Sequence, residues 1–277
     1  MRDGKRKLPA FSGGREWLVS GLAIGALGLL GGFIAVPILA LVVWTVSEEA
    51  WGAMASPVAR DALILSMKTT SATMIILIVV GTPAAYVLAR GRFRGSRALN
   101  TLVELPIVLP PSAAGIALLL AFGRFGLVGH YLNVFGITLS FTTVAVVMAE
   151  VFVAAPFYLR QAATGFSDVD RAIEEAALVD GADRTAAFFR VTIPLAYPAL
   201  VAGAVTAWAR ALGEFGATII FAGNFRGITQ TIPLAIYSEF QSNIDAAVAL
   251  SVLVLGFAFA VILSVRYLSR RAVEYRH

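Results

Sequence analysis

Two oppositely charged residues, Arg210 and Glu214, stand four positions apart inside a long apolar stretch. Residues four apart share one face of a helix, so the two side chains can form an internal ion pair. Charges inside a membrane-spanning helix are costly and usually face a partner or a cavity. The pattern predicts either a structural ion pair or a wall of a translocation path. Catalysis is a poor third interpretation, because no nucleophile, metal cluster or second base lies nearby in the sequence.

Two further charges lie within apolar stretches. Glu150 has apolar neighbours, and we expect it to pair with another span, with Arg210 as the candidate partner. Lys68 lies near the outer end of its stretch, where a long side chain reaches the membrane interface. For Lys68, snorkelling is therefore favoured over a binding role.

The residue types give little support for a metal-binding or a nucleotide-binding site. The chain has no cysteine, and its two histidines, His130 and His277, are far apart in sequence. The Gly-x-x-x-x-Gly-Lys-Ser/Thr motif of nucleotide sites does not occur. We therefore expect no metal site, no cofactor and no catalytic residue, and we do not expect an enzyme.

The composition is that of a membrane protein. Of the 277 residues, 58% are hydrophobic and only 14% are charged, whereas soluble domains are about half apolar and a quarter charged. A span needs roughly 20 predominantly apolar residues. The sequence predicts an all-α polytopic fold, with one transmembrane domain over 1–277 and spans at about 18–46, 63–89, 101–123, 139–159, 195–222 and 246–267.

Basic residues lie mostly on one side of these six spans. The N-terminus, the loops after the second and fourth spans, and the C-terminus carry most of the 22 lysines and arginines. Cytoplasmic loops are enriched in such residues, so both termini and the loop 160–194 are predicted to be cytoplasmic. The long first stretch predicts a retained helix rather than a cleaved signal peptide. The net charge of +5 then reflects topology, and nucleic acid is not an expected partner.

The segment 160–194 is the longest polar run in the chain. Ser167 followed by Asp170 resembles a capping box that starts a helix. Gly181 can take the left-handed conformation that ends a helix, and Asp183 can cap a second one. These signals predict a rigid unit of two short helices between two spans, with an ordinary solvated loop as the alternative.

This loop resembles the EAA motif of ABC-importer permeases: it contains Glu175-Ala176-Ala177, three residues, Gly181, nine residues, then Val191-Thr192-Ile193-Pro194. The chain departs from the motif only at Val191 and Ile193. In that family the loop is the coupling helix, which sits in a cleft of the ATP-hydrolysing subunit. The resemblance implies docking on separate ATPase subunits through Glu174, Glu175, Ala176, Ala177, Gly181, Ala182 and Pro194.

The third span begins with three prolines, Pro106, Pro110 and Pro111. Proline removes a backbone donor and kinks a helix, and at membrane depth the freed carbonyls must face protein or a wet cavity. Two interpretations stay open, a structural kink and a broken stretch that lines a substrate path.

Several stretches are similar to molybdate permeases, with sulfate and tungstate permeases next: Leu105-Pro106 with Leu109-Pro110-Pro111, the run from Arg210 to Ile220, Ala222-Gly223-Asn224, and the run from Thr229 to Tyr237. The similarity covers about residues 63–268. It implies the fold of a type I ABC-importer permease. A dianion in the path needs hydrogen-bond donors and helix N-termini. The candidate path residues are Pro110, Pro111, Ser112, Arg210, Glu214, Thr218 and Asn224.

Together these features predict the permease subunit of an ATP-driven ABC importer in the cell inner membrane, carrying an oxyanion and first of all molybdate. The implied partners are two cytoplasmic ATPase subunits, an external substrate-binding protein, a second copy of the chain and membrane lipid. Sulfate and tungstate are alternative substrates. An ion-coupled secondary transporter, with Glu150, Arg210 and Glu214 as its coupling site, is a further alternative. The outer segment 222–243 either contacts the binding protein or only connects two spans.

Overall fold

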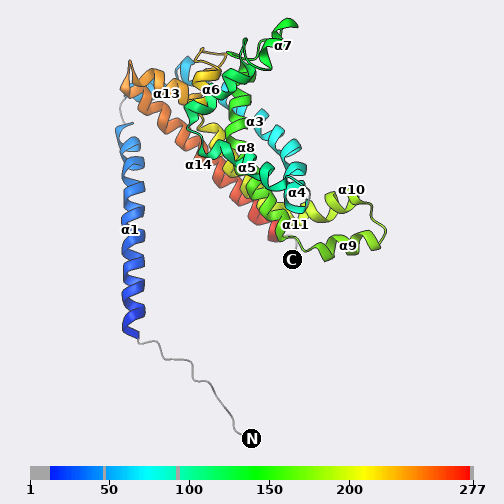
Figure 1. The fold of residues 1–277 in the computed structure, drawn as a ribbon. Helices are drawn as coiled ribbons and strands as arrows, with labels where there is room; N and C mark the ends of the chain where they lie inside the picture. The colour runs from blue at the N-terminus through cyan, green and yellow to red at the C-terminus, as the bar shows by residue number, and fades with distance from the viewer. Residues whose placement is uncertain (1–12, 46–47, 92–93, 275–277) are drawn as a thin grey trace.

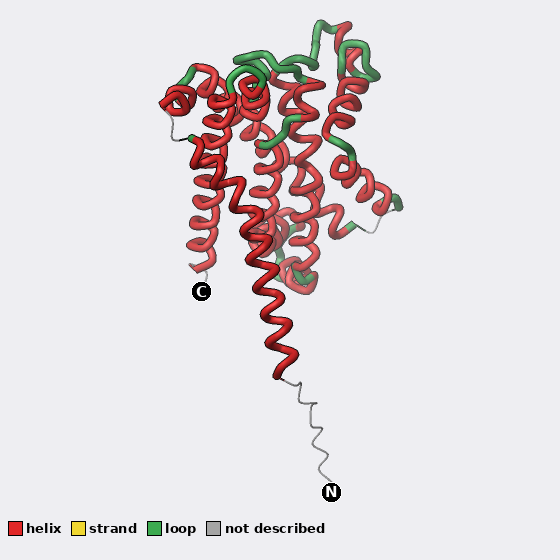
Figure 2. The backbone as a smooth tube through the Cα atoms, turned by 90° about the vertical axis from the view of Figure 1, so that its left-hand side faces the viewer, coloured by secondary structure: helices red, strands yellow, loops and turns green. Residues whose placement is uncertain are grey.

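The structure is a computed structural model that describes residues 13–45, 48–91 and 94–274. Helices make up the regular structure of this part of the chain, which contains no strand (Figures 1 and 2). The all-α prediction is thereby confirmed. In chain order the helices are α1 (Gly13–Trp44), α2 (Glu48–Met54), α3 (Pro57–Ile76), η1 (Leu77–Gly81), α4 (Thr82–Arg90), α5 (Ser96–Val108), α6 (Pro111–Phe122), α7 (Gly129–Val134), α8 (Thr143–Asp168), α9 (Arg171–Val179), α10 (Arg184–Ala187), η2 (Phe188–Thr192), α11 (Ile193–Leu212), α12 (Gly216–Phe221), α13 (Ile232–Phe240) and α14 (Ile244–Glu274).

Five continuous helical stretches in the described residues are long and apolar enough to cross a membrane, and α5 with α6 forms a sixth if the bent pair counts as one span. The five are Ser20–Trp44, Pro57–Arg90, Thr143–Asp168, Arg184–Leu212 and Ile244–Val265. Val46, at the end of the expected first span, and His277 lie outside the described residues. The chain is therefore a polytopic membrane protein.

Helix α8 lies at the centre of the bundle, with α3, α4, α5 and α11 packed around it (Figure 1). Small residues let α8 and α11 approach closely. A methyl group on Gly165 of α8 would lie 2.3 Å from the Cβ of Ala199 in α11, far inside contact distance. The core between these helices includes Ala154, Tyr158, Ala162, Phe166, Ala196 and Leu200.

Helix α1 stands apart from this bundle over most of its length and contacts α14 near its C-terminal end, around Leu41 (Figure 1). Between residues 20 and 44 none of its side chains is buried in the protomer. Its apolar surface therefore faces the surroundings of the protomer, as expected for a helix whose neighbours are lipid or other chains.

The stretch expected as a single span over 195–222 is two helices, since α11 ends at Leu212 and α12 begins at Gly216. The break occurs at Gly213, whose backbone closes α11, and at Glu214, whose side chain accepts a hydrogen bond from the first turn of α12. The third span is also broken. Leu109 is extended before Pro110, and α5 and α6 meet at an angle of 118°.

Candidate functional site

The chain after α8 folds into two short helices, and this α9–α10 unit (residues 169–187) projects from the end of the bundle (Figure 1). Asp170 caps α9, because its Oδ1 accepts the N–H of Ala172 at 2.9 Å. Gly181 has a φ of +94°, and beyond it the N–H of Ala182 donates to the carbonyl of Ala177 at 3.0 Å. This Schellman turn is the left-handed glycine closure that the sequence predicts.

The predicted start of the first short helix is wrong. Ser167 lies in the last turn of α8, where its hydroxyl donates to the carbonyl of Ala163 at 2.9 Å. Helix α8 thus continues into the segment expected as loop, and the cap of α9 is Asp170 alone. The second cap is confirmed, because the Oδ1 of Asp183 accepts the N–H of Ala186 at 2.5 Å.

The outer surface of α9 is largely apolar. Ile173, Leu178 and Val179 are 46%, 40% and 87% exposed. Glu175 and Ala176 are also exposed. Exposed apolar side chains grouped on one short helix are typical of a protein-docking surface.

Glu174 fastens α9 to the bundle. Its Oε1 accepts hydrogen bonds from the guanidinium of Arg90 and from the hydroxyl of Thr192, both at 2.9 Å. The same Arg90 Nη2 donates to the carbonyl of Val169 at 2.7 Å. Arg90 ends α4 and Thr192 directly precedes α11, so this Glu174 junction (Arg90, Glu174 and Thr192) connects α9 with two spans. A displacement of α9 must therefore move those spans or break the junction.

The breaks of the third and fifth spans lie against each other. A methyl group on Gly216 would lie 2.5 Å from the Cβ of Pro111 and 3.3 Å from the backbone nitrogen of Ser112. A methyl group on Gly115 would lie 2.9 Å from the carbonyl oxygen of Ala217. Only glycine allows α6 and α12 to pack this closely.

Arg210 and Glu214 form the predicted ion pair, with 2.6 Å between Arg210 Nη2 and Glu214 Oε2. Glu214 lies beyond the end of α11. The pair therefore joins the last turn of α11 to the residues that follow it and does not lie on one helix face. The other oxygen of Glu214 accepts the N–H of Ala217 at 2.7 Å. The side chain of Glu214 is 1% exposed and that of Arg210 is 27% exposed. Glu214 therefore contacts both sides of the break, and the side chain of Arg210 stays partly exposed.

The expected pairing of Glu150 with Arg210 is wrong. The two carboxylate oxygens of Glu150 accept hydrogen bonds of 2.8 Å from the hydroxyls of Thr69 and Thr73 in α3. Arg210 is instead engaged by Glu214. Buried carboxylate oxygens need donors, and the threonines of α3 supply one to each.

The remaining predicted path residues are divided between two places. Ser112 is exposed in the first turn of α6, beside the two breaks, and Thr218 is buried in α12. Asn224 lies elsewhere: its Nδ2 donates to the hydroxyl of Ser238 in α13 at 2.8 Å. It is not part of the contact between α6 and α12.

Residues 78–274 match the family model described as the binding-protein-dependent transport system inner membrane component. The chain belongs to this family. Its members are transport components, so the prediction of an ABC-importer permease rather than an enzyme is confirmed.

This permease resembles proteins named for molybdenum transport. It is 43% identical over 233 residues to the molybdenum transport system permease protein ModB of Mycobacterium tuberculosis, covering 84% of this chain and 88% of that protein. It is 38% identical over 203 residues to ModB of Escherichia coli K12, covering 73% and 89%. It is 37% identical over 260 residues to a probable molybdenum ABC transporter permease of Haloferax volcanii, covering 92% of each.

A solved structure shares the fold of the permease. It is the crystal structure of a bacterial ABC transporter that imports the acidic polysaccharide alginate, with a TM-score of 0.73 and 17% identity over 93% of this chain and 96% of that one. At that identity the likeness concerns the fold, which is the type I importer fold predicted from the sequence.

Sequence reasoning missed two residues of the permease, Arg90 and Thr192. In the sequence Arg90 only adds to the positive charge of its loop, and Thr192 only fills a position in the EAA ending. The partner of Arg90 is 84 positions away. The one available signal is that Arg90 ends an apolar span directly, without an intervening linker.

Proposed function

We propose that this chain is the permease subunit of an ATP-driven importer of molybdate, with both termini and the α9–α10 unit in the cytoplasm. The observation that carries the proposal is the 43% identity to a molybdenum permease across 84% of the chain. Tungstate and sulfate have the same tetrahedral dianionic shape, and we place them second because the relatives are named for molybdenum.

Two ATPase subunits would dock on the exposed face of α9 in two copies of the chain. The docking residues we propose are Glu174, Glu175, Ala176, Ala177, Gly181, Ala182 and Pro194. The apolar exposure of Ile173, Leu178 and Val179 supports this surface. ATP binding would bring the ATPase subunits together and displace α9, and hydrolysis would reset it.

The Glu174 junction is the route by which that displacement reaches the membrane. Arg90 would pass it to α4, and Thr192 would pass it to α11. Because α11 carries Arg210 at its far end, the broken spans would then rearrange. Nucleotide that bound equally well to both conformations of the transporter would not shift the equilibrium between them. The nucleotide-bound ATPase dimer must therefore favour one position of α9.

The substrate path is proposed along the two breaks, with Pro110, Pro111, Ser112, Arg210, Glu214 and Thr218 in or behind its wall and Asn224 nearer the outer end. The first turn of α6 has no side-chain cap. Free N–H groups there and the exposed part of Arg210 suit a dianion. Glu214 keeps the local charge balanced, which suits passage better than tight binding. Selectivity would then reside mainly in an external binding protein.

The test is uptake of radiolabelled molybdate into proteoliposomes that contain the chain with its ATPase subunit, supplied with ATP inside and binding protein outside. Uptake should need all three components and should be competed by tungstate. Uptake driven by an ion gradient without the ATPase would contradict the proposal and favour a secondary transporter. Uptake of sulfate alone would contradict the substrate.

A further inference from the structure

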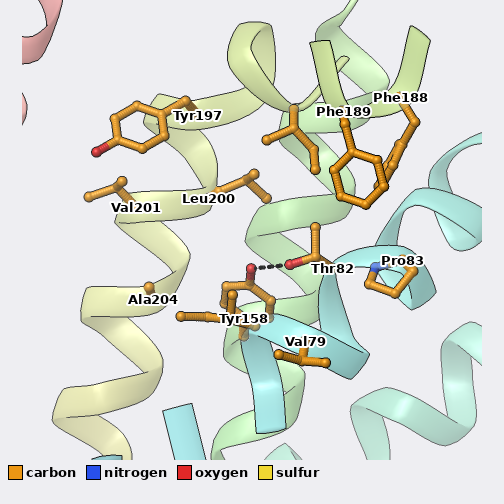
Figure 3. Close-up of a pocket in the computed structure, with 12 residues that line it drawn as sticks. Val79, Thr82, Pro83, Tyr158, Phe188, Phe189, Tyr197, Leu200, Val201 and Ala204 are labelled. Carbon is orange, nitrogen blue, oxygen red and sulfur yellow. Dashed lines mark hydrogen bonds between the residues drawn. The ribbon is translucent and has the colours of Figure 1, made fainter. Parts of the chain in front are cut away.

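A cavity of about 540 Å³ opens on the side of the bundle formed by η1, α4, α8, η2 and α11 (Figure 3). All five elements belong to candidate membrane spans. The cavity lies at the end of the bundle that carries the α9–α10 unit, because η2 directly follows α10. Its walls are almost entirely apolar and include Val79, Phe189, Tyr197, Leu200, Val201 and Ala204.

Of the three hydroxyl groups that line this cavity, those of Thr82 and Tyr158 satisfy each other, and the hydroxyl of Tyr197 points away from that pair (Figure 3). Thr82 and Tyr158 share a hydrogen bond of 2.6 Å across its floor (Figure 3). They offer little to a polar ligand, and an oxyanion entering here would lose hydration without replacement. The chemistry of the walls therefore selects an apolar ligand.

Helix α11 presents the cavity on one face and small or polar residues on the opposite one. Tyr197, Val201 and Ala204 recur at helical spacing on the cavity side. Ala202 and Thr206 lie on the other side and are exposed. The cavity is therefore on the apolar side of the helix, which faces hydrocarbon in a membrane span.

The dimensions and charge fit one leaflet. From Ile193 to Ala204 the helix rises about 16 Å, about half of the roughly 30 Å hydrocarbon core. At the end near the α9–α10 unit, Phe189 is 60% exposed. Its neighbour Arg190 is exposed and forms none of the ion pairs found among the described residues. A basic residue at this level attracts anionic headgroups.

We propose that this cavity binds an acyl chain of an anionic phospholipid, with the phosphate beside Arg190. The bound chain would pack between η2 and η1, the two π-helical turns that interrupt the spans on either side of Tyr158. Such turns are frequent at functional sites. Lipid in this position would support the segment that links the α9–α10 unit to α11.

The test uses the full chain in nanodiscs of phosphatidylglycerol that contain a tracer with a diazirine in the middle of one acyl chain. After illumination, mass spectrometry locates the lipid adducts. We expect adducts concentrated on the peptides around Tyr158 and Leu200. Ala204→Phe fills the cavity and should lower their yield about tenfold. Ala84→Phe, on an exposed position of α4 outside the cavity, is the matched control and should leave the yield unchanged.

Val201→Trp is a second variant, placed at the rim, in case Ala204→Phe does not fold. An unchanged adduct yield in either folded variant would overturn the proposal. So would adducts spread evenly over exposed apolar residues such as Ile75 and Val80. A disulfide-linked dimer formed by a Tyr197→Cys variant, whose sequence holds no other cysteine, would show that protein covers the cavity and would also overturn the proposal. Because the readout is a lipid adduct, it is independent of any transport assay.

Discussion

The guanidinium of Arg90 and the carboxylate of Glu174 lie 2.9 Å apart and join the end of α4 to α9. Their side chains are 13% and 14% exposed, so water competes little with the contact. Thr192 donates to the same carboxylate oxygen from the start of the fifth span. One acidic side chain thereby holds a projecting helix to two membrane helices. This arrangement suits a part that must transmit motion.

We expect Glu174→Ala to uncouple ATP hydrolysis from uptake, because α9 would keep the other proposed docking residues but lose its link to α4 and α11. Arg90 would keep the carbonyl of Val169 as an acceptor but lose its charged partner, which should cost about 1–3 kcal/mol of stability. The measurement is the ratio of molybdate transported to ATP hydrolysed in proteoliposomes, together with the thermal midpoint. The ratio should fall while ATPase activity persists.

Thr192 provides a matched pair of variants for the same junction. Thr192→Val removes the hydroxyl at nearly constant volume and should lower the coupling ratio, whereas Thr192→Ser keeps the donor and should preserve most of it. If both variants behave alike, the hydroxyl is not part of the transmission route.

The fold could be predicted from the sequence because its signals are local. Long apolar runs identify membrane helices, and the glycine turn at Gly181 and the cap at Asp183 depend on residues a few positions apart. The EAA spacing is also contained in one loop. For the same reason the α9–α10 unit was predictable, apart from the true end of α8 near Ser167.

The contacts that join distant elements could not be predicted. Arg90 and Glu174 are 84 positions apart, and Glu150 and Thr69 are 81 apart. Threonine in an apolar helix carries no periodic signal, so nothing in the sequence marks Thr69 and Thr73 as the donors to Glu150. The predicted pairing of Glu150 with Arg210 rested on charge alone. Arg210 instead forms its ion pair with Glu214, which is four positions away in the sequence.

Gly181→Val should uncouple transport while leaving membrane insertion intact. Gly181 has a φ of +94°, a left-handed conformation that β-branched residues rarely adopt. The substitution should displace the end of α9 and with it the proposed docking face. Gly181→Asn is the control, because asparagine tolerates this conformation. Coupled uptake should be lost in the valine variant and largely kept in the asparagine variant. Normal uptake with valine would remove the turn from the docking surface.

Glu214→Gln should lower the stability of the junction between α11 and α12. The amide oxygen can still accept from Ala217, but Arg210 loses its ion-pair partner. Removing the partner of a fully buried charge costs about 3–5 kcal/mol of stability. The cost should be smaller here, because the side chain of Arg210 is partly exposed. The checks are the thermal midpoint in detergent and the uptake rate. If the thermal midpoint and the uptake rate are both unchanged, the charge of Glu214 has neither a structural role nor a role in the pathway.

Gly216 and Gly213 provide the sharpest comparison at the broken spans, because they lie three positions apart and differ in their surroundings. A methyl group on Gly216 would lie 2.5 Å from Pro111, whereas one on Gly213 would meet only the carbonyl of Ala209 at 3.5 Å, an ordinary contact. Neither glycine has a positive φ, so the backbone tolerates alanine at both. Gly216→Ala should therefore destabilise the protein by about 1–3 kcal/mol through overpacking, while Gly213→Ala should stay within about 0.5 kcal/mol. Thermal unfolding of both variants in the same detergent measures the difference, and equal midpoints would show that α6 and α12 do not pack as closely as the structure has them.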